Sequence, residues 1–239
     1  MPGPVFVAGA TGYTGREVVR ECRARGLETV AHVRPDSRSL DSWRQRFEAL
    51  GARVDTTAWE LEAMSATLQA LQPSWVYSLL GTTRARGKTD TGSAVAETYE
   101  AVDYGLSVML LEAAIACGSK PRFVYLSAMG AGGRPMNAYM DVRKRVEAAV
   151  EGSELPHLIA RPGFISGSDR DEWRAGERIA AVVSDGVLGV LGKLGARRLA
   201  TRYTSMSGAE LARALVELAC ASPGAREIAE VEQLKRAAG

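Results

Sequence analysis

The sequence has few of the residues that build metal centres, disulfide frameworks or nucleic-acid surfaces. Its 239 residues include three cysteines and two histidines, and aromatic residues make up only 6%. Cys22, Cys117 and Cys220 lie far apart and form no CxxC pair, so we expect reduced thiols in a cytoplasmic protein and no metal site. Basic and acidic residues number 30 and 28 and are interleaved, which predicts no nucleic-acid partner.

Long apolar runs are also absent. No stretch of about 18 apolar residues occurs, so no membrane-spanning helix is predicted. The opening MPGPVFVAGATG has no basic segment followed by a long apolar one, so we expect no secretory leader. Hydrophobic residues nevertheless make up 46%, which predicts a chain that folds around a buried core. His32 and His157 each fall in a predicted strand and are expected to be buried there.

Short apolar runs alternate along the chain with segments of helical period. We expect strands at 5–9, 28–33, 52–55, 74–80, 121–127, 155–160 and 226–231. Helices are expected after the first strand as far as Arg25, and at 41–50, 61–71, 91–118, 137–151 and 207–221. This alternation predicts an α/β fold, a doubly wound parallel sheet of the Rossmann type with helices on both faces.

No linker rich in Pro, Gly or Ser divides the chain, so we expect one domain over 1–239. Within it we predict a dinucleotide-binding core at 1–163, an irregular substrate-side segment with a helix at 164–225, and a last strand and tail at 226–239. The least regular part, 164–206, is expected to cover the active site.

A glycine-rich turn, GATGYTG at 9–15, directly follows the first strand and opens the first helix. In that position Gly9 permits a tight turn, Gly12 lets the backbone approach a pyrophosphate, and Gly15 permits close helix packing. The free N–H groups at the helix start would then bind the phosphates. The turn therefore predicts a dinucleotide site.

The end of the second strand indicates which dinucleotide binds. An acidic residue there would favour NAD, whereas an arginine accommodates the 2′-phosphate of NADP. Arg34 follows that strand directly, and its planar fork suits a phosphate. Arg38 could assist, and Asp36 is expected to point into the loop. We therefore predict NADP(H), with NAD as the less favoured alternative.

Several further motifs occur in an order that resembles a known superfamily. Val54-Asp55 ends the third strand, LLGTTR (79–84) closes the fourth, and VDYGLSVMLLEAA (102–114) lies in a long helix. FVYLSAMGA (123–131), NAYMDVR (137–143) and RPG (161–163) follow. Together with GxxGxxG these resemble the short-chain dehydrogenase/reductase superfamily in its extended and atypical branches. The similarity is greatest to atypical members related to the Tat-interacting-protein oxidoreductase.

This resemblance implies a set of site residues. The catalytic positions would be Ser127, Tyr139 and Arg143. The cofactor-binding positions would be Gly9, Thr11, Gly12, Tyr13, Thr14, Gly15, Arg34, Asp55, Leu80, Gly81, Thr82, Arg143, Pro162 and Ile165. Asp55 would contact adenine, and Ile165 would lie near the nicotinamide amide. The departure from the family is Arg143, where the family has lysine.

The pair Tyr139 and Arg143 can be assessed from physical chemistry. Residues four apart share a helical face, so a cation at 143 would favour the ionised phenol of a tyrosine at 139. Arg143 is such a cation and could also donate to ribose hydroxyls, but arginine does not join a proton relay. We therefore predict an enzyme that is slowed or altered. Lys144 lies about 140° further round a regular helix and is expected to point away.

Three functions are consistent with these features. The first is an NADP(H)-dependent oxidoreductase acting on a small-molecule carbonyl or alcohol, with Tyr139 as acid/base and Ser127 stabilising the substrate oxygen. The second is a non-catalytic NADP(H)-binding regulator, which the arginine at 143 favours. The third is a nucleotide-sugar epimerase, ranked last because little sequence follows RPG. Helices 91–118 and 137–151 could pair across a homodimer.

Overall fold

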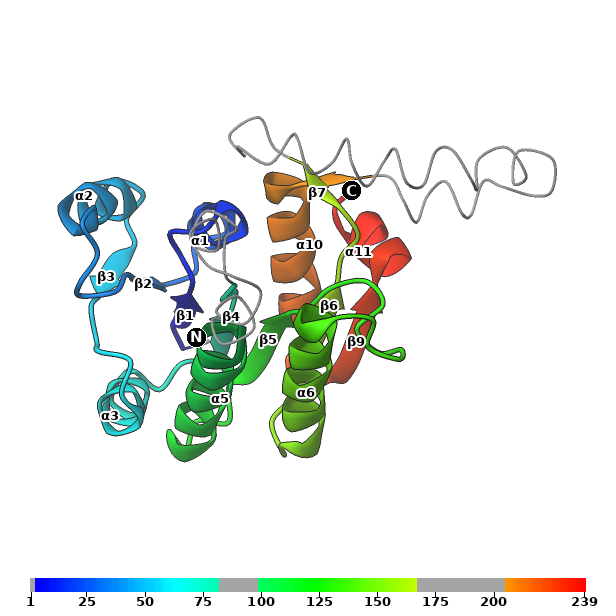
Figure 1. The fold of residues 1–239 in the computed structure, drawn as a ribbon. Helices are drawn as coiled ribbons and strands as arrows, with labels where there is room; N and C mark the ends of the chain where they lie inside the picture. Colours follow the sequence, from blue (N-terminus) through cyan, green and yellow to red (C-terminus); the bar gives the residue numbers. More distant parts are fainter. Residues whose placement is uncertain (1–2, 82–98, 167–204) are drawn as a thin grey trace.

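The computed structural model describes residues 3–81, 99–166 and 205–239. Within these ranges the predicted Rossmann architecture is confirmed, with a sheet between two layers of helices (Figure 1). No helix among the described residues is both long and apolar enough to cross a membrane.

The main sheet has seven strands in the order β3-β2-β1-β4-β5-β6-β9, and every pairing is parallel. The strands are β1 (Val5–Ala8), β2 (Thr29–His32), β3 (Arg53–Asp55), β4 (Trp75–Ser78), β5 (Arg122–Leu126), β6 (His157–Arg161) and β9 (Arg226–Glu230). The strands β1, β2 and β4 are buried along their whole length, which explains their continuous apolar runs. The strand order reverses between β1 and β4, where folds of this type bind their ligands.

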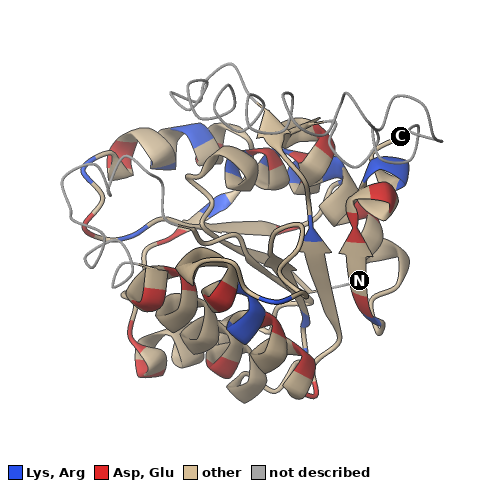
Figure 2. Ribbon diagram, turned by 45° about the vertical axis from the view of Figure 1, so that its right-hand side comes forward, with Lys and Arg blue, Asp and Glu red and all other residues tan. Residues whose placement is uncertain are grey.

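Helices cover both faces of the sheet (Figure 1). One layer contains α1 (Tyr13–Ala24), α2 (Leu40–Ala49), α10 (Gly208–Ala221) and α11 (Val231–Ala237). Its core includes Val18, Phe47 and Leu211, all almost completely buried. The other layer contains α3 (Leu61–Leu71), α5 (Leu106–Ala116) and α6 (Ala138–Gly152). Acidic and basic residues are interspersed over the helices of both layers (Figure 2).

A buried arginine joins β5 to the C-terminal end of α10. Arg122 is 1% exposed, and its Nη1 donates to the carbonyls of Leu218 (2.9 Å), Ala219 (3.1 Å) and Ser222. These are among the carbonyls that a helix leaves without intrahelical partners at its C-terminus, where a cation is also favoured by the helix dipole. Arg122 therefore caps the C-terminal end of α10 from the strand beneath it, and its Nη2 pairs with Glu227 at 2.5 Å.

Three local features differ from the sequence-based expectation. The long helix predicted at 91–118 begins, in its described part, as a π-helix, η2 (Tyr99–Gly105), before α5 starts. The segment after β9, expected as a tail, forms α11. A short parallel pair, β7 (Ile165–Ser166) with β8 (Met206–Ser207), lies at the two ends of the segment that was expected to be irregular, 164–206. Residues 167–204 of that segment lie outside the described residues.

Candidate functional site

The glycine turn lies at the crossover between β1 and β4. Gly9 has a φ of +78°, and a Cβ there would lie 2.5 Å from the Leu79 carbonyl oxygen. A Cβ at Gly15 would lie 2.1 Å from the Gly9 oxygen, so α1 packs directly on the turn. Both positions therefore require glycine, one for its conformation and one for close approach.

The start of α1 has the features of an anion site. Gly12 is the N-cap residue and provides no side-chain cap, so no cap side chain satisfies the first N–H groups of the helix. Such a helix start favours a phosphate through its free N–H groups and dipole. Thr11 and Tyr13 flank Gly12 and are partly exposed, and Thr14 is buried. The local geometry thus fits the pyrophosphate of a dinucleotide.

Tyr13 also reaches the short strand β7 and the start of α10. Its hydroxyl donates to the Ser166 carbonyl at 2.8 Å and accepts from the Gly208 N–H at 3.4 Å. A Cβ at Gly208 would lie 2.6 Å from the Tyr13 ring. The predicted cofactor residue Tyr13 therefore joins the glycine turn to β7 and to the start of α10.

Arg34 follows β2 at the same edge of the sheet. Its side chain is 41% exposed, and Nη1 lies 3.4 Å from the Asp36 carboxylate. Asp36, expected to point away into the loop, instead lies beside Arg34. The reason is a turn in which the Ser37 N–H donates to the Arg34 carbonyl, bringing the first and third side chains together. The contact is long and exposed, which leaves Arg34 accessible to a phosphate.

Asp55 ends β3 and is bonded locally. Its two carboxylate oxygens accept from the Thr57 N–H (3.2 Å) and the Thr57 hydroxyl (2.9 Å). The Thr57 carbonyl in turn contacts His32 Nε2 at 2.8 Å. Asp55 therefore shapes the loop after β3, and its predicted contact with adenine stays a prediction.

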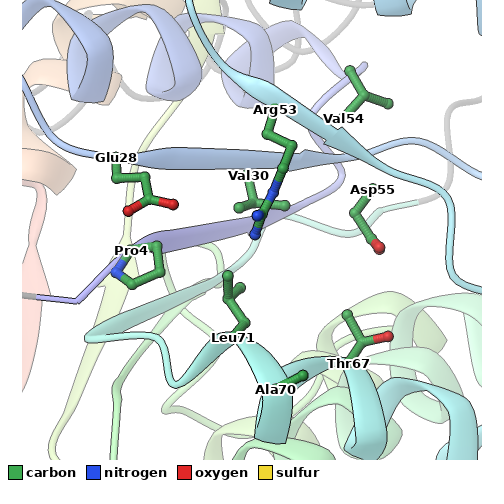
Figure 3. Close-up of a pocket in the computed structure, with 9 residues that line it drawn as sticks. All are labelled: Pro4, Glu28, Val30, Arg53, Val54, Asp55, Thr67, Ala70 and Leu71. Atoms are coloured by element: carbon green, nitrogen blue, oxygen red, sulfur yellow. The ribbon is translucent and has the colours of Figure 1, made fainter.

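Asp55 also borders a pocket of about 590 Å³ on the α3 side of the sheet (Figure 3). Its walls are β2, β3 and the C-terminal half of α3, and the Arg53 side chain extends across it toward Leu71 (Figure 3). Pro4 and Glu28 line its other end and precede β1 and β2. The pocket therefore extends toward the amino ends of the strands and is separate from the glycine turn.

Arg143 is buried in a cage of protein acceptors, a feature that sequence reasoning missed. Nη1 donates to the Tyr125 hydroxyl (3.1 Å) and the Leu126 carbonyl (2.7 Å). Nη2 donates to the Leu80 carbonyl (3.3 Å) and to Asp103 Oδ1 (2.8 Å). The side chains of Arg143 and Asp103 are only 6% and 0% exposed.

This cage changes what Arg143 can do. Both terminal nitrogens already donate to protein atoms, and Nε is buried without a hydrogen-bond partner among the described residues. Burial acts to lower the pKa of Arg143, but Tyr125, Tyr139 and Asp103 together raise it above the ordinary arginine value. The charge is thus permanent and is compensated by the Asp103 carboxylate. The ribose contact predicted for Arg143 would have to use Nε.

Burial also affects Tyr125 inside the cage. Desolvation raises the pKa of its phenol to about 12, although Arg143 acts in the opposite direction. Tyr125 therefore stays neutral at physiological pH and serves as a hydrogen-bond partner of Arg143.

Tyr139 lies at the start of α6, half-buried, beside this cage. The Arg143 guanidinium carbon lies over its ring, 5.1 Å from the centroid, and the Tyr99 ring meets it edge-on at 5.5 Å. The cation thus contacts the ring of Tyr139. Lys144 points away as predicted, because its Nζ donates to the Gly133 carbonyl at 3.0 Å on the exposed side of α6.

Ser127 follows β5 and is 4% exposed. Its hydroxyl lies 2.5 Å from Glu147 Oε1, and Glu147 is paired with Arg161 at 2.7 Å. Sequence reasoning missed Glu147 and Arg161. The helical spacing of Tyr139, Arg143 and Glu147 could have identified Glu147, because the three lie on one face of α6.

The remaining predicted residues lie near the same edge or outside the described part. Leu80 and Gly81 follow β4, and a Cβ at Gly81 would lie 3.1 Å from Arg143 Nη2. Pro162 follows β6, and its carbonyl accepts from the Met129 N–H at 2.9 Å. Ile165 lies in β7. Thr82 lies outside the described residues. In the described ranges, no group of three His, Cys, Asp or Glu could hold a metal.

Comparison with known proteins agrees with this geometry. A family model described as NAD(P)H-binding matches residues 9–187. The chain is 30% identical over 204 residues to the chloroplastic protein TIC 62 of Oryza sativa subsp. japonica, covering 78% of this chain but only 40% of that protein. It is also 30% identical over 178 residues to protein HTATIP2 of Rattus norvegicus, covering 74% of this chain and 68% of the relative.

Solved structures show the same fold at low identity. An oxidoreductase of the short chain dehydrogenase/reductase family from Burkholderia thailandensis superposes with a TM-score of 0.66 at 16% identity, covering 97% of this chain and 91% of that one. A 3-oxoacyl-(acyl-carrier protein) reductase from Brucella melitensis, in complex with NAD, gives 0.68 at 14% identity and covers 98% of both chains. With most of its length matched by the family model and its fold shared with Rossmann reductases, the chain belongs to the NAD(P)H-binding family.

Proposed function

We propose that this protein is an NADP(H)-dependent oxidoreductase that acts on a carbonyl or alcohol group of a small molecule. The observation that carries this proposal is a convergence at the carboxyl edge of the sheet. The glycine turn with its uncapped helix start meets the end of β4 there, and Ser127 and Tyr139 follow the neighbouring strand β5. This edge is where doubly wound folds bind dinucleotides.

The residues at this edge fit a dinucleotide. The start of α1 would bind the pyrophosphate, Arg34 the 2′-phosphate, and the backbone at Leu80-Gly81 would line the cofactor. Bound there, the nicotinamide would supply or accept the hydride. The preference for NADP over NAD rests on Arg34, which is accessible and only loosely contacted by Asp36.

The chain's own residues would perform the rest of the chemistry. Tyr139 would give or take a proton at its phenol oxygen, and Ser127 would hold the substrate oxygen. Arg143 does not move a proton, because a guanidinium keeps its charge. Its proposed contribution is to hold the Tyr139 ring and the ends of β4 and β5 in one arrangement, through the contacts of its cage.

A second candidate is a non-catalytic NADP(H)-binding regulator. It is favoured by one observation: the cation next to Tyr139 is neutralised by Asp103 and both its terminal nitrogens are occupied. Cofactor binding would then change the surface that the protein presents to a partner.

Homodimerisation through α5 and α6 and a cytoplasmic location also stay predictions.

Titration of the purified protein with NADPH and with NADH tests the cofactor proposal. We expect tighter NADPH binding, and an Arg34→Gln variant should lose roughly 10- to 100-fold in NADPH affinity while NADH affinity is unchanged. Arg44→Gln is the matched control, because Arg44 is an exposed arginine on α2 with only a 3.9 Å pair to Glu48. Equal affinity for both cofactors, unaffected by Arg34→Gln, would contradict the proposal.

Turnover separates the two candidate functions. A panel of aldehydes, ketones and the matching alcohols would be incubated with NADPH or NADP⁺ and followed at the nicotinamide absorbance. Oxidation or reduction that is lost in Tyr139→Phe supports the oxidoreductase. Tight NADPH binding with no turnover across the panel supports the regulator.

A further inference from the structure

The hydroxyl proton of Ser127 is already committed to a protein acceptor. Ser127 Oγ lies 2.5 Å from Glu147 Oε1, within the core of the fold. A serine hydroxyl has one proton and two lone pairs, whereas an ionised carboxylate can only accept. If Glu147 is ionised, Ser127 must therefore be the donor in this bond.

The surroundings of Glu147 hold it in the ionised form. Arg161 donates two hydrogen bonds to the carboxylate of Glu147, from Nε to Oε1 at 3.0 Å and from Nη2 to Oε2 at 2.7 Å. Glu147 is 2% exposed, and a buried carboxylate of this kind persists when it is paired with a cation and hydrogen-bonded.

Arg161 is in turn fixed in place. Its Nη1 donates to Glu230 on β9 at 2.9 Å, and the turn at Gly132 packs so closely on the guanidinium that a Cβ there would lie 2.5 Å away. The orientation of Glu147, and with it the direction of the Ser127 bond, is therefore set by groups from β6, β9 and the loop after β5.

We infer that Glu147 is a positioning residue that turns the Ser127 proton inward, so that Ser127 presents acceptor lone pairs to the site. The group that Ser127 recognises in the resting complex is then a hydrogen-bond donor, such as the hydroxyl of an alcohol substrate. Because that hydroxyl has one proton, it must turn from Ser127 to the phenol oxygen of Tyr139 when Tyr139 takes the proton. A carbonyl oxygen has no proton and would need the one on Ser127, but the charge-assisted bond to Glu147 retains that proton. The affinity of the site for the carbonyl form should therefore be roughly 10- to 100-fold lower than it would be with a free serine hydroxyl. This inference rests on the proposed function and specifies the substrate form that the resting site prefers.

Glu147→Gln should weaken this polarity in either orientation of the amide. With the amide nitrogen at the Oε1 position, Ser127 would accept from it; with the amide oxygen there, Ser127 would donate to a neutral acceptor, which is weaker than a carboxylate. In both cases the Ser127 proton is held less tightly and becomes available to the site. The variant should raise KM for the alcohol and lower KM for the matching carbonyl, whereas a purely structural loss would worsen both.

A spectroscopic measurement decides the inference without any substrate. In a Ser127→Cys variant, the infrared S–H stretching band reports whether the side chain at 127 donates a hydrogen bond. Subtracting the spectrum of the parent protein removes the three native thiols. We expect a band at lower frequency than a free thiol, moving to higher frequency when Glu147→Gln is added. Glu230→Gln is the control, because it removes a negative charge paired with Arg161 and does not contact Ser127.

The outcomes separate the inference from the proposed function. A band at the free-thiol frequency, or one that Glu147→Gln does not move, would overturn the inference whatever the enzyme does. A shifted band with KM values that change in the same direction for alcohol and carbonyl would also overturn it. Absence of turnover in the whole panel would remove the oxidoreductase proposal, while the infrared band would still report the direction of the Ser127 bond.

Discussion

The buried pair between Asp103 and Arg143 makes a quantitative prediction. Asp103→Asn keeps the shape of the side chain and removes its charge, which leaves Arg143 as an uncompensated cation at 5% exposure. Breaking one side of a buried ion pair costs about 3–5 kcal/mol. The amide oxygen can still accept a hydrogen bond, so we expect a loss near 3 kcal/mol. In a chain of this size that corresponds to a fall in Tm of roughly 6–12 °C.

The assay is thermal and urea unfolding, and the same π-helix provides the control. Glu100 in η2 forms a fork with Arg145 on α6, with both bonds at 2.8 Å, but the two side chains are 51% and 42% exposed. Glu100→Gln should therefore change stability little, because exposed pairs are screened by water. The two substitutions differ mainly in burial.

Two results would refute this reasoning. One is an Asp103→Asn variant as stable as Glu100→Gln, which would mean that the carboxylate does not compensate the buried guanidinium. The other concerns the double variant Asp103→Leu, Arg143→Met, which leaves no unpaired charge and should be more stable than Asp103→Asn alone. A double variant that is less stable would show that the hydrogen bonds of the cage outweigh its electrostatics.

Three further predictions concern stability and cofactor binding. Gly15→Ala places a Cβ 2.1 Å from a backbone oxygen and should lower Tm and abolish NADPH binding as measured by calorimetry. The control Gly152→Ala has open space around the added Cβ and should leave NADPH affinity unchanged. Arg122→Met removes the Arg122 bonds to the Leu218 and Ser222 carbonyls, while the Ala219 carbonyl still accepts from Trp75 Nε1. It should cost about 2–4 kcal/mol in urea unfolding, and a loss below about 1 kcal/mol would contradict the capping role of Arg122. Burial lowers the pKa of His32 and of His157; the folded state therefore binds fewer protons, and the urea midpoint should fall as pH drops below about 6.5 and stay flat between pH 7 and 8.

Most of the architecture could be predicted from the sequence, because the central strands are short runs of mostly apolar residues. Residues 5–8, for example, are completely buried, and such runs alternate with helical periods in only a few fold types. The glycine turn was also predictable, because positions 9 and 15 admit no side chain. The parallel pair β7 and β8 was not, since two residues on each side give no periodic signal.

The interior of the site was harder to predict. The spacing in the sequence places Tyr139 and Arg143 on one face of α6, but it does not predict which groups the Arg143 guanidinium contacts. Those contacts depend on Asp103, which lies in the π-helix η2, and on carbonyls at the ends of strands. Likewise, no local spacing links Ser127 to its buried partner Glu147, because the two residues lie on different elements.

The cage also has an evolutionary consequence. Position 143 is coupled to position 103 by charge and to position 81 by space, since a Cβ at Gly81 would lie 3.1 Å from the guanidinium. A lysine at 143 has a single nitrogen and could not satisfy the four acceptors that arginine reaches. Replacing arginine by lysine at this position would therefore also require changes at the positions that contact it. Without those changes the protein would contain buried groups with no partner, so selection would act on its stability before it could act on its catalytic activity.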